Sequence, residues 1–192
     1  MKMKHHTVFI VIGMLSGVSG CNESSSTASG PGSQEELILN GSFEQGGAPS
    51  LTGWKQSYPD TAFAHFSTDV PAGGGSYSLS LLNTWGPLPD LQATVPAAPG
   101  LHHFRLTFYS KETPAIARQF ASGIVSIAHK TVDSLVYRKW IGVSDSDWTG
   151  YTLLDTILAA QGDSIIVSLA GGQTQWSFGQ TLFDLVSFLK LD

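Results

Sequence analysis

Short runs in which apolar and polar residues alternate constrain the fold of this chain more than any other feature. The clearest run is His102 to Lys111, where Phe104, Leu106 and Phe108 occupy every second position. In an extended strand such residues share one face, so this segment predicts a strand that is buried on one side. Ser164–Ala170 alternates in the same way. No stretch has the three-to-four-residue spacing of a helix, and the sequence therefore predicts an all-β fold.

Glycine and proline divide the rest of the chain into further short strand candidates. The chain has 21 glycines and 9 prolines, and only 13% of its residues are charged, which is typical of a turn-rich β protein. The other expected strands are Glu36–Leu39, Trp54–Tyr58, Ala62–Thr68, Tyr77–Asn83, Leu91–Val95, Gly123–Lys130, Leu135–Val143, Tyr151–Leu158 and Thr181–Leu191. About ten strands at this spacing predict a β-sandwich or jelly roll.

Residues 1–20 have the composition of an export signal. Lys2 and Lys4 precede the apolar run Val8–Leu15, which is too short to span a bilayer. The next segment, Val18-Ser19-Gly20-Cys21, resembles the lipobox of bacterial lipoproteins. The resemblance implies cleavage before Cys21 and acylation of its thiol, which would hold the mature chain to a membrane. The alternative is a plain secretory signal followed by a chance cysteine.

Residues 21–35 are rich in serine and glycine, and we expect them to form a flexible tether behind the lipidated cysteine, with the folded domain over residues 36–192. Asn22 follows Cys21, which favours the outer membrane under the common sorting rule for two-membrane bacteria. Cys21 is the only cysteine, so no internal disulfide is expected. Removal of residues 1–20 takes the net charge from −5 to −7, which argues against nucleic-acid binding through phosphate contacts.

Short motifs follow one another along the expected domain. They are Asn40-Gly41-Ser42-Phe43-Glu44, Gly53-Trp54, Asn83-Thr84-Trp85-Gly86-Pro87, Leu91-Gln92, Pro99-Gly100, Leu106-Thr107-Phe108, Trp148-Thr149-Gly150-Tyr151-Thr152, Gly162-Asp163-Ser164 and Phe183-Asp184-Leu185-Val186-Ser187-Phe188. In this order they resemble the carbohydrate-binding modules of families 4, 9 and 22. The resemblance covers about Leu37 to Leu191 and implies a galactose-binding-domain-like jelly roll.

The same resemblance implies a structural calcium site that joins the first and last strands. Glu44 and Asp184 would supply carboxylates, and backbone carbonyls near Gly75 and Ser76 would complete the oxygen ligands that Ca²⁺ requires. The chain departs from the family motif at Leu185, where a second aspartate is common. The alternative is that Glu44 is a surface acid and Asp184 caps a turn.

Aromatic residues are the expected contacts for a sugar, because a ring face packs against the apolar C–H groups of the sugar. Trp85 is the first choice, since it lies just past an expected strand and resembles a tryptophan that stacks on xylan in family 22. Tyr137 resembles another aromatic residue of that cleft. Trp176 lies in a loop, where we expect it to be exposed. Trp54 and Trp148 are expected to pack in the core.

One strand departs from this resemblance. Ser164–Ala170 carries only aliphatic residues, serine and alanine, where the xylan-binding type has aromatic and acidic cleft residues. The main hypothesis is a non-catalytic, membrane-anchored lipoprotein that binds a polysaccharide or envelope glycan. The alternative is a structural or protein-interaction lipoprotein with the same fold, an envelope protein as partner and no affinity for sugar.

The chain is not expected to be an enzyme. Gly162-Asp163-Ser164 resembles the nucleophile motif of a group of esterases, but a strand follows it where those enzymes have a helix. The sequence also has no histidine after His129. A turn before a strand explains the motif, and a hydrolase is the third and weakest hypothesis.

Overall fold

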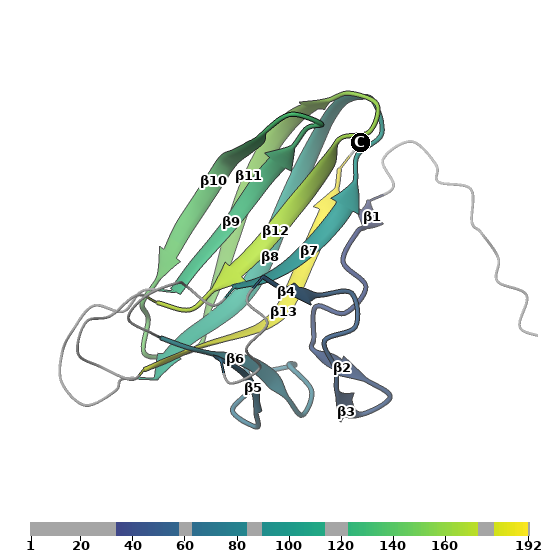
Figure 1. Ribbon diagram of the computed structural model, residues 1–192. Coiled ribbons are helices and arrows are strands. Elements are labelled where there is room, and N and C mark those ends of the chain that lie inside the picture. Colours follow the sequence, from purple (N-terminus) through teal and green to yellow (C-terminus); the bar gives the residue numbers. More distant parts are fainter. Residues whose placement is uncertain (1–33, 58–62, 84–89, 114–122, 173–178, 192) are drawn as a thin grey trace, which may run out of the picture.

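The computed structural model describes residues 34–57, 63–83, 90–113, 123–172 and 179–191, and these form an all-β sandwich of two facing sheets (Figure 1). The predicted jelly roll is thereby confirmed. Over the described ranges there is no α-helix, and hence none that is long and apolar enough to cross a membrane.

The first sheet has the order β11–β8–β13–β6–β5, with β1 paired to β13, and neighbouring strands are antiparallel. Its strands are β1 (Glu35–Glu36), β5 (Ala64–Ser67), β6 (Ser78–Leu82), β8 (Gly100–Thr113), β11 (Thr149–Ala159) and β13 (Gln180–Lys190). Because β1 pairs with the end of β13, the two ends of the described chain lie side by side.

The second sheet has the order β10–β9–β12–β7–β4 and is also antiparallel. Its strands are β4 (Lys55–Gln56), β7 (Asp90–Pro96), β9 (Gly123–Lys130), β10 (Leu135–Val143) and β12 (Ser164–Ala170). A separate hairpin is made by β2 (Glu44–Gln45) and β3 (Ala48–Pro49), and it lies at the lower end of the sandwich in Figure 1.

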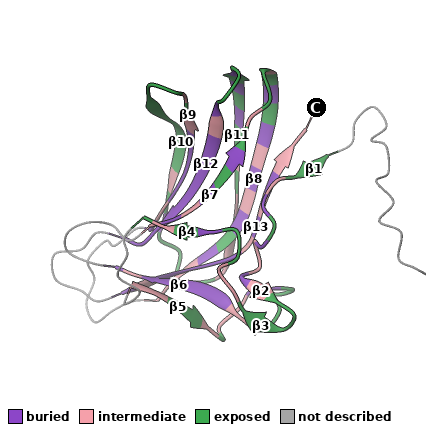
Figure 2. Ribbon diagram, turned by 45° about the vertical axis from the view of Figure 1, so that its right-hand side comes forward, coloured by how far each residue is buried: buried purple, intermediate pink, exposed green. Residues whose placement is uncertain are grey.

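The core lies between the sheets and is built from the alternating residues that the sequence predicts (Figure 2). Phe104, Leu106 and Phe108 of β8 are all buried, and the ring of Phe104 stacks on Phe188 of β13 with centroids 5.2 Å apart. The second sheet contributes the buried side chains of Val125, Ile127, Ile165, Val167 and Leu169. Burial of these side chains is the main force that holds the two sheets together.

Most of the expected strands are observed, but Glu36–Leu39 was too long, because β1 ends at Glu36, and Trp54–Tyr58 is reduced to Lys55–Gln56 among the described residues. Ser164–Ala170, Gly123–Lys130 and Leu135–Val143 begin and end at the predicted residues, whereas the β2–β3 hairpin was not predicted. Trp54 is in the core as expected, and its indole donates a hydrogen bond of 2.8 Å to the Asn40 carbonyl.

The expectation for Trp148 was wrong, because this side chain is only partly buried. Its indole nitrogen donates to Asp69 Oδ1 at 2.9 Å, and Lys111 Nζ lies 2.7 Å from the other oxygen of that carboxylate. The hydrogen bond to Asp69 thus keeps the Trp148 ring near the surface, where it is not fully buried.

The segment before β2 is docked onto the last strand. The amide of Leu37 donates to the Phe188 carbonyl, and the amide of Val186 donates to the Gly41 carbonyl, both at 2.9 Å. The register of β13 against β8 shifts between Asp184 and Ser187, so the strand bulges where this segment meets it. This docking brings Glu44, at the start of β2, next to Asp184.

Candidate functional site

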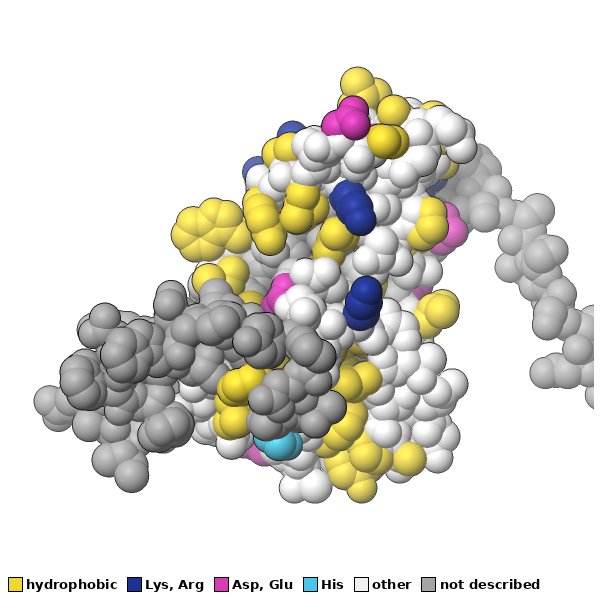
Figure 3. Space-filling view, in the orientation of Figure 1, with side chains coloured by type: hydrophobic (Ala, Val, Ile, Leu, Met, Phe, Trp, Pro, Cys, Tyr) yellow, Lys and Arg dark blue, Asp and Glu magenta, His cyan; other side chains and the backbone are white. Residues whose placement is uncertain are grey.

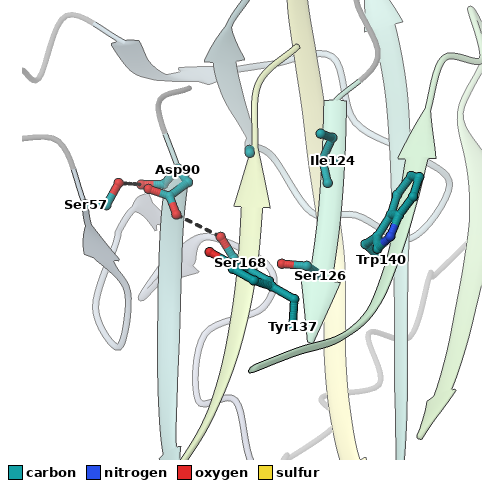
Figure 4. Close-up of a pocket in the computed structure, with 8 residues that line it drawn as sticks. Ser57, Asp90, Ile124, Ser126, Tyr137, Trp140 and Ser168 are labelled. Carbon is teal, nitrogen blue, oxygen red and sulfur yellow. Dashed lines mark hydrogen bonds between the residues drawn. The ribbon is translucent and has the colours of Figure 1, made fainter. Parts of the chain in front are cut away.

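A hollow of about 470 Å³ lies on the face of the second sheet that points away from the core. Figure 3 shows hydrophobic side chains projecting along the edge of the molecule formed by β10. The hollow is lined by Ser57, Asp90, Ile124, Ser126, Tyr137, Trp140, Ser168 and Ala170 (Figure 4). Its volume and its mixture of aromatic and polar side chains are typical of a site for a small ligand.

Small side chains on the two central strands form the floor of the hollow. Ser126 of β9 lies opposite Ser168 of β12, and Ile124 lies opposite Ala170 in the same pair of strands. Alternation sends Val125 and Leu169 to the core and leaves Ser126, Ser168 and Ala170 on the outer face, together with the larger Ile124. Because serine and alanine rise little above the backbone, the middle of this face is hollow.

A bulge in β10 places two aromatic rings on the same side of the sheet. Tyr137 pairs with Ala128 and Trp140 pairs with Ser126, and the register shifts by one residue between Tyr137 and Lys139. Residues three apart in a regular strand face opposite sides, so the extra residue Arg138 is what brings the two rings together. The Tyr137 and Trp140 side chains are 62% and 70% exposed, and both line the hollow.

Arg138 turns away from the hollow. Its Nε lies 3.4 Å from Asp155 Oδ2, and its Nη2 donates to the Thr156 carbonyl at 3.1 Å. Both partners belong to β11 of the other sheet, so these contacts hold the bulge in place against the sandwich edge. The guanidinium group is thereby kept out of the ligand face.

Asp90 supplies a carboxylate from the opposite side of the hollow. Its Oδ2 accepts hydrogen bonds from Gln92 Nε2 at 2.7 Å and Ser168 Oγ at 2.9 Å, and its backbone carbonyl accepts one from the Ser57 amide at 3.1 Å. These contacts fix the carboxylate across the floor from the rings (Figure 4). A carboxylate and serine hydroxyls can bind hydroxyl groups, while the rings can cover C–H groups.

The structure brings only part of the predicted ligand set together. Tyr137 lines the hollow, while Trp85 and Trp176 lie outside the described residues. Trp140, Asp90 and Ser168 were not among the predicted ligand residues. The only sequence signal for Trp140 is its nearness to Tyr137, and strict alternation would assign these two residues to opposite faces.

Glu44 lies near enough to Asp184 for its charge to raise the pKa of the Asp184 carboxyl. A role of these two acids as metal ligands stays a prediction. Glu44 Oε1 accepts short hydrogen bonds from the amides of Ser76 and Tyr77. A Cβ on Gly75 would be 2.8 Å from the oxygens of Glu44, and one on Gly74 would overlap Asp184 Oδ2. The loop that contains Gly74 and Gly75 therefore contacts both acids. It contacts Glu44 through backbone N–H groups, and a ligand role for the Gly75 and Ser76 carbonyls stays a prediction.

Asp184 is fully buried, and only one of its two carboxylate oxygens accepts a hydrogen bond. Its Oδ1 accepts the Leu185 amide at 2.7 Å, and its Oδ2 is buried without a hydrogen-bond partner. Burial, the largest cause, raises the pKa of this carboxyl to about 7; the Leu185 amide opposes the rise and the nearby charge of Glu44 adds to it. An unpartnered buried oxygen beside a second carboxylate fits a hard cation.

The backbone is strained next to both Glu44 and Asp184. Phe43 and Leu185 are the non-glycine residues with positive φ in the described ranges, at 56° and 50°. Each is next to one of the two acids in sequence, and each such conformation costs about 1–3 kcal/mol. A strained backbone position therefore adjoins each of the two acids. Among the described residues, no group of three or more His, Cys, Asp or Glu side chains gathers to hold a metal, so other oxygens would have to complete the shell.

Asp163 has a structural role in a turn. Its Oδ2 accepts a hydrogen bond from the Ala160 amide at 2.8 Å and lies 2.8 Å from His129 Nε2. The Ala160 amide and then His129 lower the pKa of this carboxyl. These contacts lock the turn before β12, and Gly162-Asp163-Ser164 is thus the turn before a strand that the sequence predicts.

No protein-family model and no curated protein sequence matches this chain. Solved structures share its fold. A family 16 carbohydrate-binding module has a TM-score of 0.57 at 20% identity, over 79% of this chain and 98% of that one. The CBM22-1 xylan-binding domain from Paenibacillus barcinonensis Xyn10C has a TM-score of 0.54 at 14% identity, over 86% of this chain and 99% of that one.

An enzyme domain shares the fold as well. The enzymatically active domain of tailspike protein 4 from bacteriophage CBA120 has a TM-score of 0.57 at 19% identity over 81% of this chain, which spans 21% of the tailspike chain. The structural neighbours thus include carbohydrate-binding modules with an all-β fold and part of a larger enzyme. At these identities the similarity shows the fold alone.

We expect the stability of the metal-free protein to depend on pH because of its buried acids. The folded-state pKa of Asp184 is about 7 and its ordinary value is 3.8, so between these values the folded state holds a proton that the unfolded chain has lost. In chelator, the free energy of unfolding should fall on the order of 2 kcal/mol as the pH rises from about 4 to above 7.

Urea unfolding at several pH values checks this. Asp184→Asn should be the more stable protein above pH about 7 and should show a smaller fall. The free energy of unfolding of Asp184→Asn should still fall somewhat as the pH rises, because burial also raises the pKa of Glu112 to about 7. The pH slope would be the same in both proteins if Asp184 were ionised throughout.

Proposed function

We propose that this chain is a non-catalytic glycan-binding protein of the bacterial cell envelope, held to a membrane by lipid on Cys21. One observation carries the glycan part: Tyr137 and Trp140 stand exposed on the same face, across a hollow from Asp90 and Ser168. Aromatic faces with a few fixed polar groups are what binding of a sugar requires.

The exposure of the two rings supports a binding role. A tryptophan that is 70% exposed beside a tyrosine that is 62% exposed leaves a large apolar area in water, although apolar area is normally buried. Asp90 is held by Gln92 and Ser168, so it need not be ordered when a ligand arrives. Preformed contacts of this kind lower the entropy cost of binding.

Printed descriptions of the structural neighbours support the same ligand class. A module described in complex with β-1,4-galactotriose matches 81% of this chain with a TM-score of 0.55, and a further neighbour is described as a xylan-binding domain. A neutral polysaccharide is therefore the first ligand to test.

A structural Ca²⁺ between Glu44 and Asp184 is part of the proposal. The orphaned Asp184 Oδ2, the second carboxylate nearby and the two strained neighbours support it. The ion would neutralise two close negative charges and tie the β2 segment to β13.

The lipid anchor rests on Val18-Ser19-Gly20-Cys21, and outer-membrane sorting rests on Asn22. Mass spectrometry of the protein from a bacterial membrane fraction should find a mature N-terminus at Cys21 that carries acyl chains. A peptide that spans an intact Gly20–Cys21 bond would contradict the anchor.

The alternative is that this face binds an envelope protein. The floor supports it, because β12 offers only aliphatic residues, serine and alanine to a ligand. Affinity electrophoresis distinguishes the two hypotheses. A protein that no polysaccharide retards would favour the protein partner.

Glycan binding should depend on the two rings. In affinity electrophoresis with galactan, xylan and acidic polysaccharides, Trp140→Ala and Tyr137→Ala should each weaken binding about tenfold, because a stacking contact at the centre of a site is lost. Asp90→Ala should weaken it similarly, through lost hydroxyl contacts.

Tyr109→Ala is the matched control, since Tyr109 is a 40% exposed tyrosine on β8 of the other sheet. It should bind like the parent protein. Trp85→Ala and Trp176→Ala test the residues predicted from sequence. Full binding by Trp140→Ala and Tyr137→Ala together would contradict this site.

Calcium should stabilise the fold through the two acids. At pH about 7.5 and a calcium concentration about 100 times Kd, the melting temperature should rise about 5–10 °C above its value in chelator. Glu44→Gln and Asp184→Asn should abolish the rise, whereas Asp133→Asn, at an exposed turn, should keep it. An equal rise in all four proteins would show that calcium acts elsewhere.

A further inference from the structure

One end of the sandwich exposes several large apolar side chains. We call it the apolar tip, and it consists of Leu101, Val132, Leu135 and Leu158, which are 57%, 82%, 48% and 71% exposed. Leu101 and Leu158 lie directly opposite each other on β8 and β11. Val132 lies in the turn that joins β9 to β10 in the other sheet, and Leu135 is the first residue of β10. Figure 3 shows hydrophobic side chains around an acidic one at this upper end.

The described chain begins at the same end. Glu35 pairs with Lys190 at the end of β13, and Lys190 pairs with Phe104 near the start of β8. The start of β8 is Gly100, which faces Ala159 at the end of β11. Residue 35 and the C-terminal residues therefore lie beside the apolar tip (Figure 1).

Cys21 lies 14 residues before Glu35 in the sequence. A glycine- and serine-rich coil of this length has a root-mean-square reach of roughly 20 Å. An acyl chain on Cys21 would hold this end of the domain within that distance of a bilayer, and the tether would raise the local concentration of membrane at the tip.

We propose that the apolar tip rests in the interface of the bilayer to which the chain is anchored. The proposal depends on the lipid-anchor part of the proposed function and is independent of the glycan part. Leucine and valine side chains at the end of a rigid sandwich can enter the headgroup region without any change of fold. The charges at this end balance, because Lys130 and Asp133 lie at the β9–β10 turn and Glu35 pairs with Lys190 beside the tip. Apolar contact is therefore the main attraction.

This orientation would raise the hollow above the membrane. Ile124 lines the hollow at the start of β9, while Lys130 ends the same strand next to the tip. Six residues of strand span roughly 20 Å. A protein that stands on its apolar tip would therefore hold the far end of the hollow, at Ile124 and Asp90, roughly 20 Å above the tip. Tyr137, two residues along β10 from Leu135, would be the part of the hollow nearest the bilayer.

A single fluorophore can test this contact, because Cys21 is the only cysteine. A polyhistidine tag replaces residues 1–21 and holds the mature chain on phosphatidylcholine vesicles that contain nickel-chelating lipid. An environment-sensitive dye is attached at Val132→Cys. On the vesicles its emission should shift to the blue and rise about twofold or more, as expected for entry into the interface.

The matched position is Ser146→Cys, an exposed site in the loop between β10 and β11 at the opposite end. Its emission should stay unchanged. Adding Leu101→Ser with Leu158→Ser should reduce the response at position 132, whereas Leu154→Ser, on the same face of β11 but away from the tip, should not.

The contact is overturned if position 132 does not respond on vesicles, or if positions 132 and 146 respond equally. The dye at position 132 could instead change its emission when envelope protein is added without vesicles, and stay unchanged on vesicles. That result would assign the tip to a protein partner and would also overturn the proposal. The vesicles carry no glycan, and acylation of Cys21 is read separately by mass spectrometry, so failure of either part of the proposed function is distinguishable.

Discussion

The alternation of side chains along a strand is the constraint on which this structure depends. Each strand can send only every second residue into the core, so a sheet that buries large residues on one face must present the others on its outer face. In the second sheet the inward positions hold Val125, Ile127, Val167 and Leu169. The outward positions between them hold Ser126 and Ser168, which rise little above the backbone, and the face is hollow there.

A single extra residue then changes what the edge of that face offers. Arg138 breaks the alternation of β10, so Tyr137 and Trp140 stand on one side and can act together. The contacts of Arg138 with Asp155 and the Thr156 carbonyl stabilise the bulge from the core side of the edge. The binding face thus depends on a contact between the two sheets, and not on β10 alone.

The strands and the two-sheet architecture could be predicted because they depend on local alternation and on turn residues, both of which are visible in the sequence. The choice of Tyr137 as a ligand residue, and of Glu44 and Asp184 as metal ligands, came from an ordered resemblance and stays a prediction. The bulge, and with it the role of Trp140, could not be predicted, because it depends on a partner strand far away in sequence. Asp90 was missed for a similar reason: its position is set by Ser168 on a neighbouring strand. Trp148 was misassigned because Asp69, its partner, lies 79 residues away.

The most direct test of the central claim follows the indole N–H signals of the protein by NMR during titration with a neutral oligosaccharide that it retains. The signal of Trp140 should move with increasing ligand, since its ring would contact the sugar. The signals of Trp54, bonded to Asn40 in the core, and of Trp148, bonded to Asp69, should stay in place. Movement of the Trp148 signal with a stationary Trp140 signal would place the ligand elsewhere and contradict the account.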